Sequence, residues 1–244
     1  MKNIKLTIEY DGTNYSGWQR QPNANTIQEE IEKAIANAIG EKITIIGAGR
    51  TDSGVHGKGQ VANFITDSSI PGTKFKYAIN RYLPEDIAII ESKEVEKSFH
   101  SRYDALGKKY KYLIYNAPIK SPLLRNYTYY VPYKLDFEKM NEAKDYFIGK
   151  HDFAAFMASG SNVEDTVRSI YYASLNTYNN IIVFEIYGDG FLYNMVRIIV
   201  GTLVDIGIGK ISPHDIINIL KSRDRKSAGH TAPPEGLYLE KVCY

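Results

Sequence analysis

The sequence predicts an α+β fold built from two successive units that share one order of strands and helices. Short segments in which polar and apolar residues alternate, as in half-buried strands, recur along the chain. Between them lie amphipathic stretches with helical spacing, bounded by capping residues and glycines. Each half follows the order strand, helix, strand, strand, helix, strand, which is the ferredoxin-like or RRM-like pattern. We therefore expect two tandem βαββαβ units with antiparallel sheets, joined in one large sheet with helices on one face.

The first half supplies six elements. Residues 3–10 alternate as a strand. Thr26 and Glu29 have the spacing of a capping box, which predicts a helix over about 27–39, closed by Gly40. The remaining elements are strands near residues 42–47 and 58–66, a helix over about 74–82 and a strand over 86–97.

The second half repeats this order. Residues 107–116 alternate as a strand, and Asp136 caps a helix that extends to about residue 148. Asn179 and Asn180 provide a tight turn between two strands. The elements that follow are strands over 167–178 and 181–187, a helix near 191–206, a short helix after Ser212 and a strand over 237–243.

Length and composition are those of an ordinary globular protein. The chain has 244 residues, of which 43% are hydrophobic and 24% are charged, enough for a core in each of two modest domains. We expect these domains to be residues 1–104 and 105–244. The formal net charge of +2 excludes a globally basic surface, so a nucleic-acid partner would depend on local clusters. The single cysteine, Cys243, excludes a disulfide within the chain and a cysteine-based zinc site.

We expect the protein to be cytoplasmic, with no membrane partner. The N-terminal sequence MKNIKLTIEYDG reads as a strand and lacks the apolar core of a signal peptide. The most apolar long window, residues 191–209, contains Arg197 and Asp205, and each of these charges is costly inside a bilayer. A buried helix in a soluble protein therefore explains this window better than a membrane span.

A glycine-rich loop with an arginine and a carboxylate separates two apolar runs in the stretch IIGAGRTDSGVHGKGQVANF, residues 45–64. Arg50 and Asp52 are separated by one residue, so on an extended backbone their side chains point the same way. The glycines leave room for a ligand to approach the backbone. The loop contains neither a dinucleotide-binding GxGxxG motif nor a P-loop. An aspartate in a turn is often structural, because it bonds its own backbone, so the pattern fits both a catalytic and a structural Asp52.

GRTDSGVHGKGQV resembles the active-site motif of the tRNA pseudouridine synthase A family. Three further blocks resemble that family in the same order: YDGTNYSGWQRQ at residues 10–21, FHSRYDALGKKYKYLIYN at 99–116 and GFLYNMVRIIVGTLVDIG at 190–207. Ser53 stands where alanine is usual in such loops. Because the blocks are spread over nearly the whole chain, the resemblance is highly specific.

The resemblance implies an isomerase that converts uridine to pseudouridine at positions 38–40 of the tRNA anticodon stem-loop. It also implies the pseudouridine synthase fold, action as a homodimer, and no metal or organic cofactor. Asp52 is the implied catalytic carboxylate. The family's arginine at the place of Arg197 pairs with that aspartate. The family's tyrosine at the place of Tyr110 lies against the target uracil, where its ring can stack and its hydroxyl can assist proton transfer.

The residues alone leave simpler explanations open for both of these partners. Arg197 lies in an apolar helical stretch, where it needs either a partner or a helix edge with its head group in water. Tyr110 and Tyr112 alternate with Lys109 and Lys111, as in any strand with one solvated face.

RNA binding requires cations that contact the phosphates. When the target base leaves the stack, a side chain should take its place. We expect Arg50 to fill it, because Arg50 is close to Asp52. Local clusters that could contact phosphates contain Arg20, Arg102, Lys108, Lys109, Lys111, Arg223, Arg225 and Lys226. His56 and His100 lack metal-ligand spacing, and we interpret them as structural residues or peripheral RNA contacts.

Two other functions remain open on the residues. A non-catalytic RNA-binding protein built from two RRM-like units would explain the fold and the basic clusters. It would not explain a carboxylate displayed toward phosphates, and no segment matches the aromatic RNP1 signature. A hydrolase that uses Asp52 with Thr51 would lack a second acid or a set of metal ligands.

Overall fold

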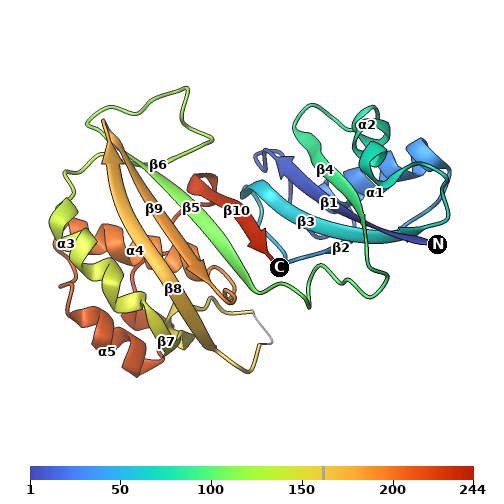
Figure 1. Cartoon of the computed structure of the whole chain (residues 1–244). Helices are drawn as coiled ribbons and strands as arrows, with labels where there is room; N and C mark the ends of the chain where they lie inside the picture. Colours follow the sequence, from blue (N-terminus) through green and yellow to red (C-terminus); the bar gives the residue numbers. More distant parts are fainter. Residues whose placement is uncertain (161–162) are drawn as a thin grey trace. The chain divides into compact units, whose positions relative to one another are not determined.

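The protein has the predicted α+β fold, in which a sheet carries helices (Figure 1). The strands were expected to be antiparallel throughout, but some of them pair in parallel, so the pairing is mixed. The computed structural model describes residues 1–160 and 163–244. The chain divides into two compact units, one made of Met1–Leu106 with Tyr238–Tyr244 and the other of Gly107–Leu237. In the ranges described, no helix is long and apolar enough to cross a bilayer.

The first unit contains β1 (Lys2–Tyr10), α1 (Ile27–Ile39), β2 (Ile46–Gly47), β3 (His56–Thr66), α2 (Phe75–Asn80), β4 (Ile87–Val95) and, from Tyr238 onward, β10 (Leu237–Cys243). The strands follow the order β4-β1-β3-β10, and β2 pairs with β3. β1 is antiparallel to both β3 and β4, whereas β10 is parallel to β3. The order of elements predicted for the first half is therefore confirmed.

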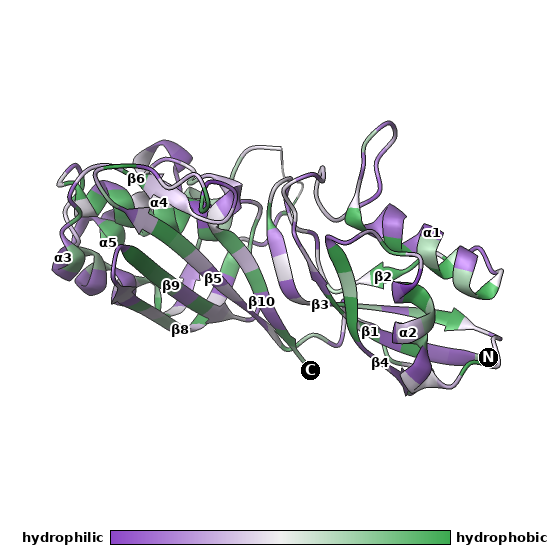
Figure 2. Cartoon of the chain, turned by 90° about the horizontal axis from the view of Figure 1, so that it is seen from above, coloured by the Kyte–Doolittle hydropathy of each residue, from purple (hydrophilic) through white to green (hydrophobic). Residues whose placement is uncertain are grey.

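Both helices of the first unit pack against one face of its sheet. Alternate residues of β1, namely Ile4, Leu6 and Ile8, are fully buried and share a core cluster with Ile31 of α1 and Phe75 of α2. Figure 2 shows hydrophobic and hydrophilic residues alternating along α1, as expected of a helix with one side against a core. The period-2 pattern of β1 and the helical pattern of α1 thus meet in a single core.

α1 begins where the sequence predicts, but the expected capping box does not form. Thr26 occupies the N-cap position with an extended backbone, and its hydroxyl bonds to none of the described residues. The first amides of the helix bond instead to the preceding loop. Ile27 N–H donates to the carbonyl of Gly17 at 3.2 Å, and Gln28 N–H donates to the carbonyl of Trp18 at 3.0 Å. These main-chain acceptors satisfy the helix terminus and tie the loop to α1.

β2 is shorter than the strand predicted over 42–47. The amide of Ile45 donates to the carboxylate of Glu32 on α1 at 3.1 Å. Because this amide is taken, the pairing with β3 begins only at Ile46. A side chain that captures a backbone donor in this way leaves no signal in the local sequence pattern.

The second unit contains β5 (Gly107–Asn116), β6 (Tyr129–Val131), α3 (Phe137–Ala143), β7 (Gly149–Asp152), β8 (Val167–Tyr178), β9 (Ile181–Gly188), α4 (Met195–Gly207) and α5 (Asp215–Ser222). Its strands follow the antiparallel order β5-β9-β8-β7, and β6 pairs parallel to β5. Asp136 caps α3 as predicted, accepting from the amide of Lys139. The short strands β6 and β7 are additional to the predicted elements.

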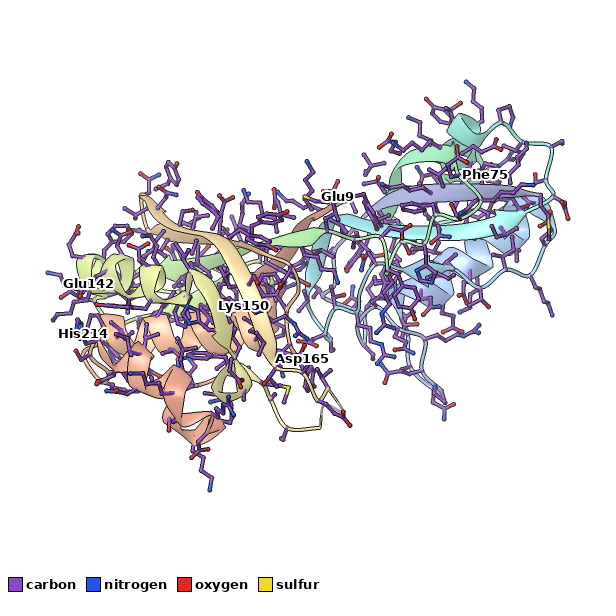
Figure 3. All side chains as sticks on the ribbon, turned by 60° about the horizontal axis from the view of Figure 1, so that its bottom comes forward. Glu9, Phe75, Glu142, Lys150, Asp165 and His214 are labelled. Carbon is purple, nitrogen blue, oxygen red and sulfur yellow. The ribbon has the colours of Figure 1, made fainter. Side chains whose placement is uncertain are left out.

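α4 is the core helix of the second unit. Every one of its residues except Arg197 is buried, which confirms the interpretation of the apolar window 191–209 as a buried helix. Figure 3 shows the helices of this unit gathered on one face of its strands. A helix that is apolar on all sides is stable only when it is covered on all sides. Arg197 is the one residue of α4 that is partly exposed.

Candidate active site

The loop between β2 and β3 presents Arg50 and Asp52 at the surface of the first unit. Along this loop Arg50 is exposed, Thr51 is buried and Asp52 is half-buried. The side chain of Thr51 points inward, where its hydroxyl lies 2.8 Å from the hydroxyl of Tyr10. This alternation agrees with the prediction that the arginine and the aspartate share a direction.

The loop before α1 holds the main chain of this segment on both sides of the aspartate. Trp18 N–H donates to the carbonyl of Thr51 at 3.1 Å. The carbonyl of Tyr15 accepts from the amide of Gly54 at 3.3 Å and from the hydroxyl of Ser53 at 3.1 Å. The backbone that carries the carboxylate is therefore fixed by contacts from a distant part of the sequence.

Two glycines make this close approach possible. Gly17 has a φ of +93°, in the left-handed region, and a Cβ there would lie 2.6 Å from the carbonyl oxygen of Thr51. At Gly12 a Cβ would lie 2.0 Å from the carbonyl oxygen of Val55. A side chain at either position would push the two loops apart.

Buried polar side chains support the loop from its inner side. Tyr10 is only 3% exposed, and burial raises the pKa of its hydroxyl well above the ordinary value, so the hydroxyl remains protonated and able to bond to Thr51. Gln60 Nε2 donates to the carbonyl of Gly49 at 2.9 Å. Sequence reasoning missed both supports. The alternation of β1 could have predicted that Tyr10 faces inward. No sequence pattern indicates that Gln60 supports the loop.

Arg50 is available to a ligand. Its exposed guanidinium makes no hydrogen bond or ion pair with any residue that the structure describes. A cationic side chain therefore stands two positions from the half-buried carboxylate of Asp52.

Tyr110 and Arg197 belong to the second unit. Tyr110 lies on β5 opposite Ile186 of β9. It is 8% exposed, and its ring meets that of Phe191 edge to face, with a centroid distance of 5.1 Å. Tyr112 is buried on the same face, as the alternation predicts.

The guanidinium of Arg197 is held by its own unit. Its Nε–H donates to the carbonyl of Ala232 at 2.7 Å, and its Nη1 donates to Oδ1 of Asn194 at 2.6 Å. Asn194 is the N-cap of α4 and has a φ of +59°. The pairing of Arg197 with Asp52 that the family resemblance implies stays a prediction.

Several cations of the expected basic clusters already have acidic partners. These ion pairs are Arg20 with Glu32 at 3.0 Å, Arg223 with Asp152 at 2.9 Å, and Lys109 and Lys111 with Glu185 at 3.1 and 3.7 Å. A phosphate that approaches these side chains must compete with the internal carboxylate.

His56 and His100, for which no metal role was expected, pack against aromatic rings. His56 is 2% exposed and stacks on Tyr238 at a centroid distance of 4.7 Å, with Nδ1 3.1 Å from the carboxylate of Asp11. His100 stacks on Tyr103 at 4.2 Å. Within the ranges described, no group of three or more His, Cys, Asp or Glu residues is arranged to hold a metal ion.

Comparisons with known proteins agree on one family. The profile of the family described as tRNA pseudouridine synthase matches residues 6–104 and 143–244. The tRNA pseudouridine synthase A of Acetivibrio thermocellus is 61% identical over 244 residues, with 100% of both chains covered. Proteins of the same name from Thermoanaerobacter sp. and Ruminiclostridium cellulolyticum are 52% and 53% identical, again with 100% of both chains covered.

A solved structure, the crystal structure of a Cbf5-Nop10-Gar1 complex, aligns with 96% of this chain and 57% of that chain at 14% identity. Its TM-score of 0.37 is too low to add to the assignment. The full-length relatives confirm the family that the four sequence blocks predict. The chain belongs to the tRNA pseudouridine synthase family and is an isomerase that acts on uridine in tRNA.

Proposed function

We propose that the enzyme makes pseudouridine at positions 38–40 of the tRNA anticodon stem-loop, with Asp52 as the catalytic carboxylate. The observation that carries this proposal is the fixed loop between β2 and β3. Its main chain is bonded on both sides of Asp52, while Asp52 is half-buried and Arg50 is exposed. A carboxylate that must meet a nucleotide in one geometry needs such a rigid backbone and an accessible side chain.

Pseudouridine formation breaks the bond between ribose C1′ and uracil N1, turns the base while it is held, and joins C1′ to C5. The proton of C5 is lost and N1 gains one, so the product is an isomer of the substrate. A single carboxylate can attack the sugar, attack the base or remove a proton from the sugar. Asp52 can serve in any of these three routes, and in each of them it must be ionised.

We assign Arg197 as the charge partner of Asp52. A nearby arginine lowers the pKa of a carboxyl by about 1–3 units, which opposes the effect of burial. Arg197 is suited to this task because Ala232 and Asn194 already orient its guanidinium.

Tyr110 is the residue that we assign to the target base. Its ring is held edge to face by Phe191, and an aromatic ring with a fixed orientation can stack on an extruded pyrimidine. Its hydroxyl can assist the proton transfer between C5 and N1.

We assign Arg50 to the anticodon stem, where its side chain fills the place that the extruded uridine leaves. Extrusion of the target uridine costs a few kcal/mol of stacking and pairing, and a side chain that fills the vacancy offsets part of that cost. Arg50→Ala should slow turnover more than it weakens tRNA binding. Equal losses in the two measurements would contradict this role.

We also infer that the enzyme is cytoplasmic, as its sequence predicts, and a homodimer, as the family resemblance implies. Sedimentation equilibrium of the purified protein tests the dimer. A single species with the mass of one chain over the whole concentration range would contradict it.

The proposed reaction is tested with tRNA transcripts that carry uridine at positions 38, 39 and 40. Pseudouridine is mapped by carbodiimide labelling and primer extension after incubation with wild type, Asp52→Asn and Asp67→Asn. Asp67 is the matched control, because it is a carboxylate of the same unit whose side chain is 72% exposed. We expect modification by wild type and Asp67→Asn and none by Asp52→Asn. Modification only at other positions would reject the site in tRNA, and an active Asp52→Asn would reject the role of the carboxylate.

A further inference from the structure

A segment of the second unit, residues 229–232, lies along α4 and bonds to both ends of a two-turn stretch of that helix. The carboxylate of Asp205 accepts from the amide of His230 at 3.2 Å. The carbonyl of Arg197 accepts from the amide of Ala232 at 3.0 Å. The two helix residues are about two turns apart, so this short segment connects a buried acid to the arginine assigned above.

Between these ends the segment touches the helix directly. The hydroxyl of Thr202 accepts from the amide of Gly229 at 3.0 Å. At Gly201 a Cβ would lie 1.8 Å from the carbonyl oxygen of His230, so only glycine permits this contact. Because of this close fit, a displacement at one end of the segment is passed to the other end.

The anchor at the inner end is a buried carboxylate. Asp205 is only 6% exposed. Its Oδ2 lies 2.9 Å from Nδ1 of His230, and its Oδ1 lies 3.3 Å from Nζ of Lys210. Burial alone raises the pKa of Asp205, but the hydrogen bonds from His230 and Lys210 outweigh it and hold the pKa below the ordinary value. The carboxylate is therefore ionised, and its bond to His230 is charge-assisted, which makes it one of the stronger bonds in this unit.

The outer end of the segment holds the guanidinium. The carbonyl of Ala232 accepts from Nε of Arg197 at 2.7 Å, while the amide of Ala232 donates to the carbonyl of Arg197 at 3.0 Å. The place of the Ala232 carbonyl therefore sets the place of the acceptor that orients the arginine side chain.

We propose that His230 and Asp205 are positioning residues that set where the guanidinium of Arg197 lies. The hydrogen bond between their side chains fixes residue 230 on α4, and residue 230 in turn fixes the carbonyl of Ala232 two residues further along. This role rests on the function proposed above for Arg197 as the partner of the catalytic carboxylate.

The test is single-turnover pseudouridine formation with enzyme in excess, measured together with tRNA binding on filters. In His230→Asn the side-chain amide can donate from the place of Nδ1, whereas in His230→Gln it reaches only the place of Nε2, and His230→Ala has no donor. We expect the rate to fall on the order of tenfold in His230→Ala and His230→Gln, as a misplaced catalytic partner does, and to be largely retained in His230→Asn. The affinity for tRNA should stay within about twofold of wild type in all three, since transition-state positioning and ground-state binding are separable.

The matched control is His214→Ala. The Nε2 of His230 lies 3.0 Å from the hydroxyl of Tyr129. His214, labelled in Figure 3, pairs with a tyrosine of the same unit in a similar way: its Nδ1 lies 2.8 Å from the hydroxyl of Tyr146. Its loss should leave the rate unchanged. If circular dichroism shows that His230→Ala does not fold, the comparison of the similar-sized Asn and Gln variants carries the test alone.

A double-mutant cycle separates positioning from a general loss of structure. In an Arg197→Lys background, which lacks the Nε–H donor, removal of the His230 side chain should cause no further loss of rate. Additive losses, equal rates of the Asn and Gln variants, or a wild-type rate in His230→Ala would overturn the positioning role. A wild-type rate in Arg197→Met, which removes the charge, would instead reject the function proposed for Arg197, so the two failures are distinguishable.

Discussion

The side chain of Asp52 depends on neighbours that lie on the inner side of its loop. Thr51 faces inward to the buried hydroxyl of Tyr10 at 2.8 Å, and its carbonyl is bound by Trp18. Because residue 51 is held in this way, the next residue has little freedom to turn. The orientation of the carboxylate is therefore a property of the core of the first unit as much as of the loop.

Replacement of Thr51 by valine keeps the volume of the side chain and removes its hydroxyl. Loss of a buried hydrogen bond should lower the free energy of unfolding by about 1–3 kcal/mol, and the freer loop should lower kcat about tenfold with little change in KM. Thr51→Ser should retain most of the rate because it keeps the hydroxyl. Steady-state kinetics and thermal melts measure both effects.

The control for that prediction is Tyr244→Phe. It removes another tyrosine hydroxyl of the first unit, which donates to the carbonyl of Ser101 at 2.6 Å, far along the sequence from the loop. Tyr244→Phe should lower stability without lowering kcat. A Thr51→Val enzyme with wild-type kcat would show that the threonine bond does not orient the loop.

The ionised carboxyl of Asp205 makes stability depend on pH. Its pKa is held below the ordinary value of 3.8, because hydrogen bonds from His230 and Lys210 outweigh burial. A pKa that is lower in the folded chain contributes stability above the unfolded pKa, and the contribution is lost as the pH falls through the folded pKa. Asp205→Asn should therefore lower Tm at neutral pH, and its difference from wild type should shrink below about pH 4. Thermal melts over this range measure it, and a difference that stays constant in acid would contradict the stabilisation by the ionised carboxylate.

Residue-level prediction from sequence succeeds where a motif carries the signal. Arg50 and Asp52 stand in a block that resembles one family, and the alternation of β5 puts Tyr110 and Tyr112 on one face. The residues that support the loop, such as Gln60, are joined to it only by folding. A hydrogen bond between distant residues has no counterpart in local periodicity, so such supports cannot be found from one sequence.

The elements were predicted well wherever hydrophobic periodicity decides them, and less well where a tertiary bond intervenes. α1 and α4 follow their amphipathic and apolar patterns. Thr26 is at the predicted N-cap, yet the carbonyls of Gly17 and Trp18 do the capping. β2 stops short because Glu32 captures the amide of Ile45. In both cases an acceptor elsewhere in the fold replaces the partner that the pattern suggests.

The contact between α4 and the segment 229–232 predicts an unusual response to Gly201→Ala. Alanine inside a helix is normally more stable than glycine by about 0.5–1 kcal/mol. Here the added Cβ would lie 1.8 Å from the carbonyl oxygen of His230, so we expect a loss of about 1–3 kcal/mol instead. Urea unfolding measures the sign.

Gly207→Ala is the control on the same helix. Its Cβ would lie 2.7 Å from Sδ of Met140, a flexible side chain that can move, so its cost should be smaller. A Gly201→Ala protein more stable than wild type would contradict the packing of the segment on α4.

The chain as a whole is divided in a way that its order of elements does not reveal. Residues 238–244 pack with the first unit, although the entire second unit precedes them in the sequence. The carbonyl of Cys243 accepts from the amide of Leu106 at 2.9 Å, and the ring of Tyr244 lies 3.9 Å from Nζ of Lys5. The first unit is therefore incomplete without a segment from the far end of the chain.

Deletion of residues 238–244 should destabilise the first unit. The variant loses the strand β10 and the stacking of Tyr238 on His56, so amides of β3 near His56 should exchange much faster with solvent. Hydrogen exchange measured by mass spectrometry on peptides of β3 tests this expectation. Tyr244→Ala should have a milder effect, and unchanged exchange in the deletion variant would contradict the division of the chain.

This division has a consequence for biosynthesis. A ribosome must translate residues 107–237 before β10 exists. Until then, the edge of β3 near His56 has no β10 to pair with. An uncovered strand edge invites pairing with other chains, and a slow or stalled ribosome lengthens that exposure. The part of the polypeptide that carries Asp52 thus matures only after the part that carries Arg197 has been made.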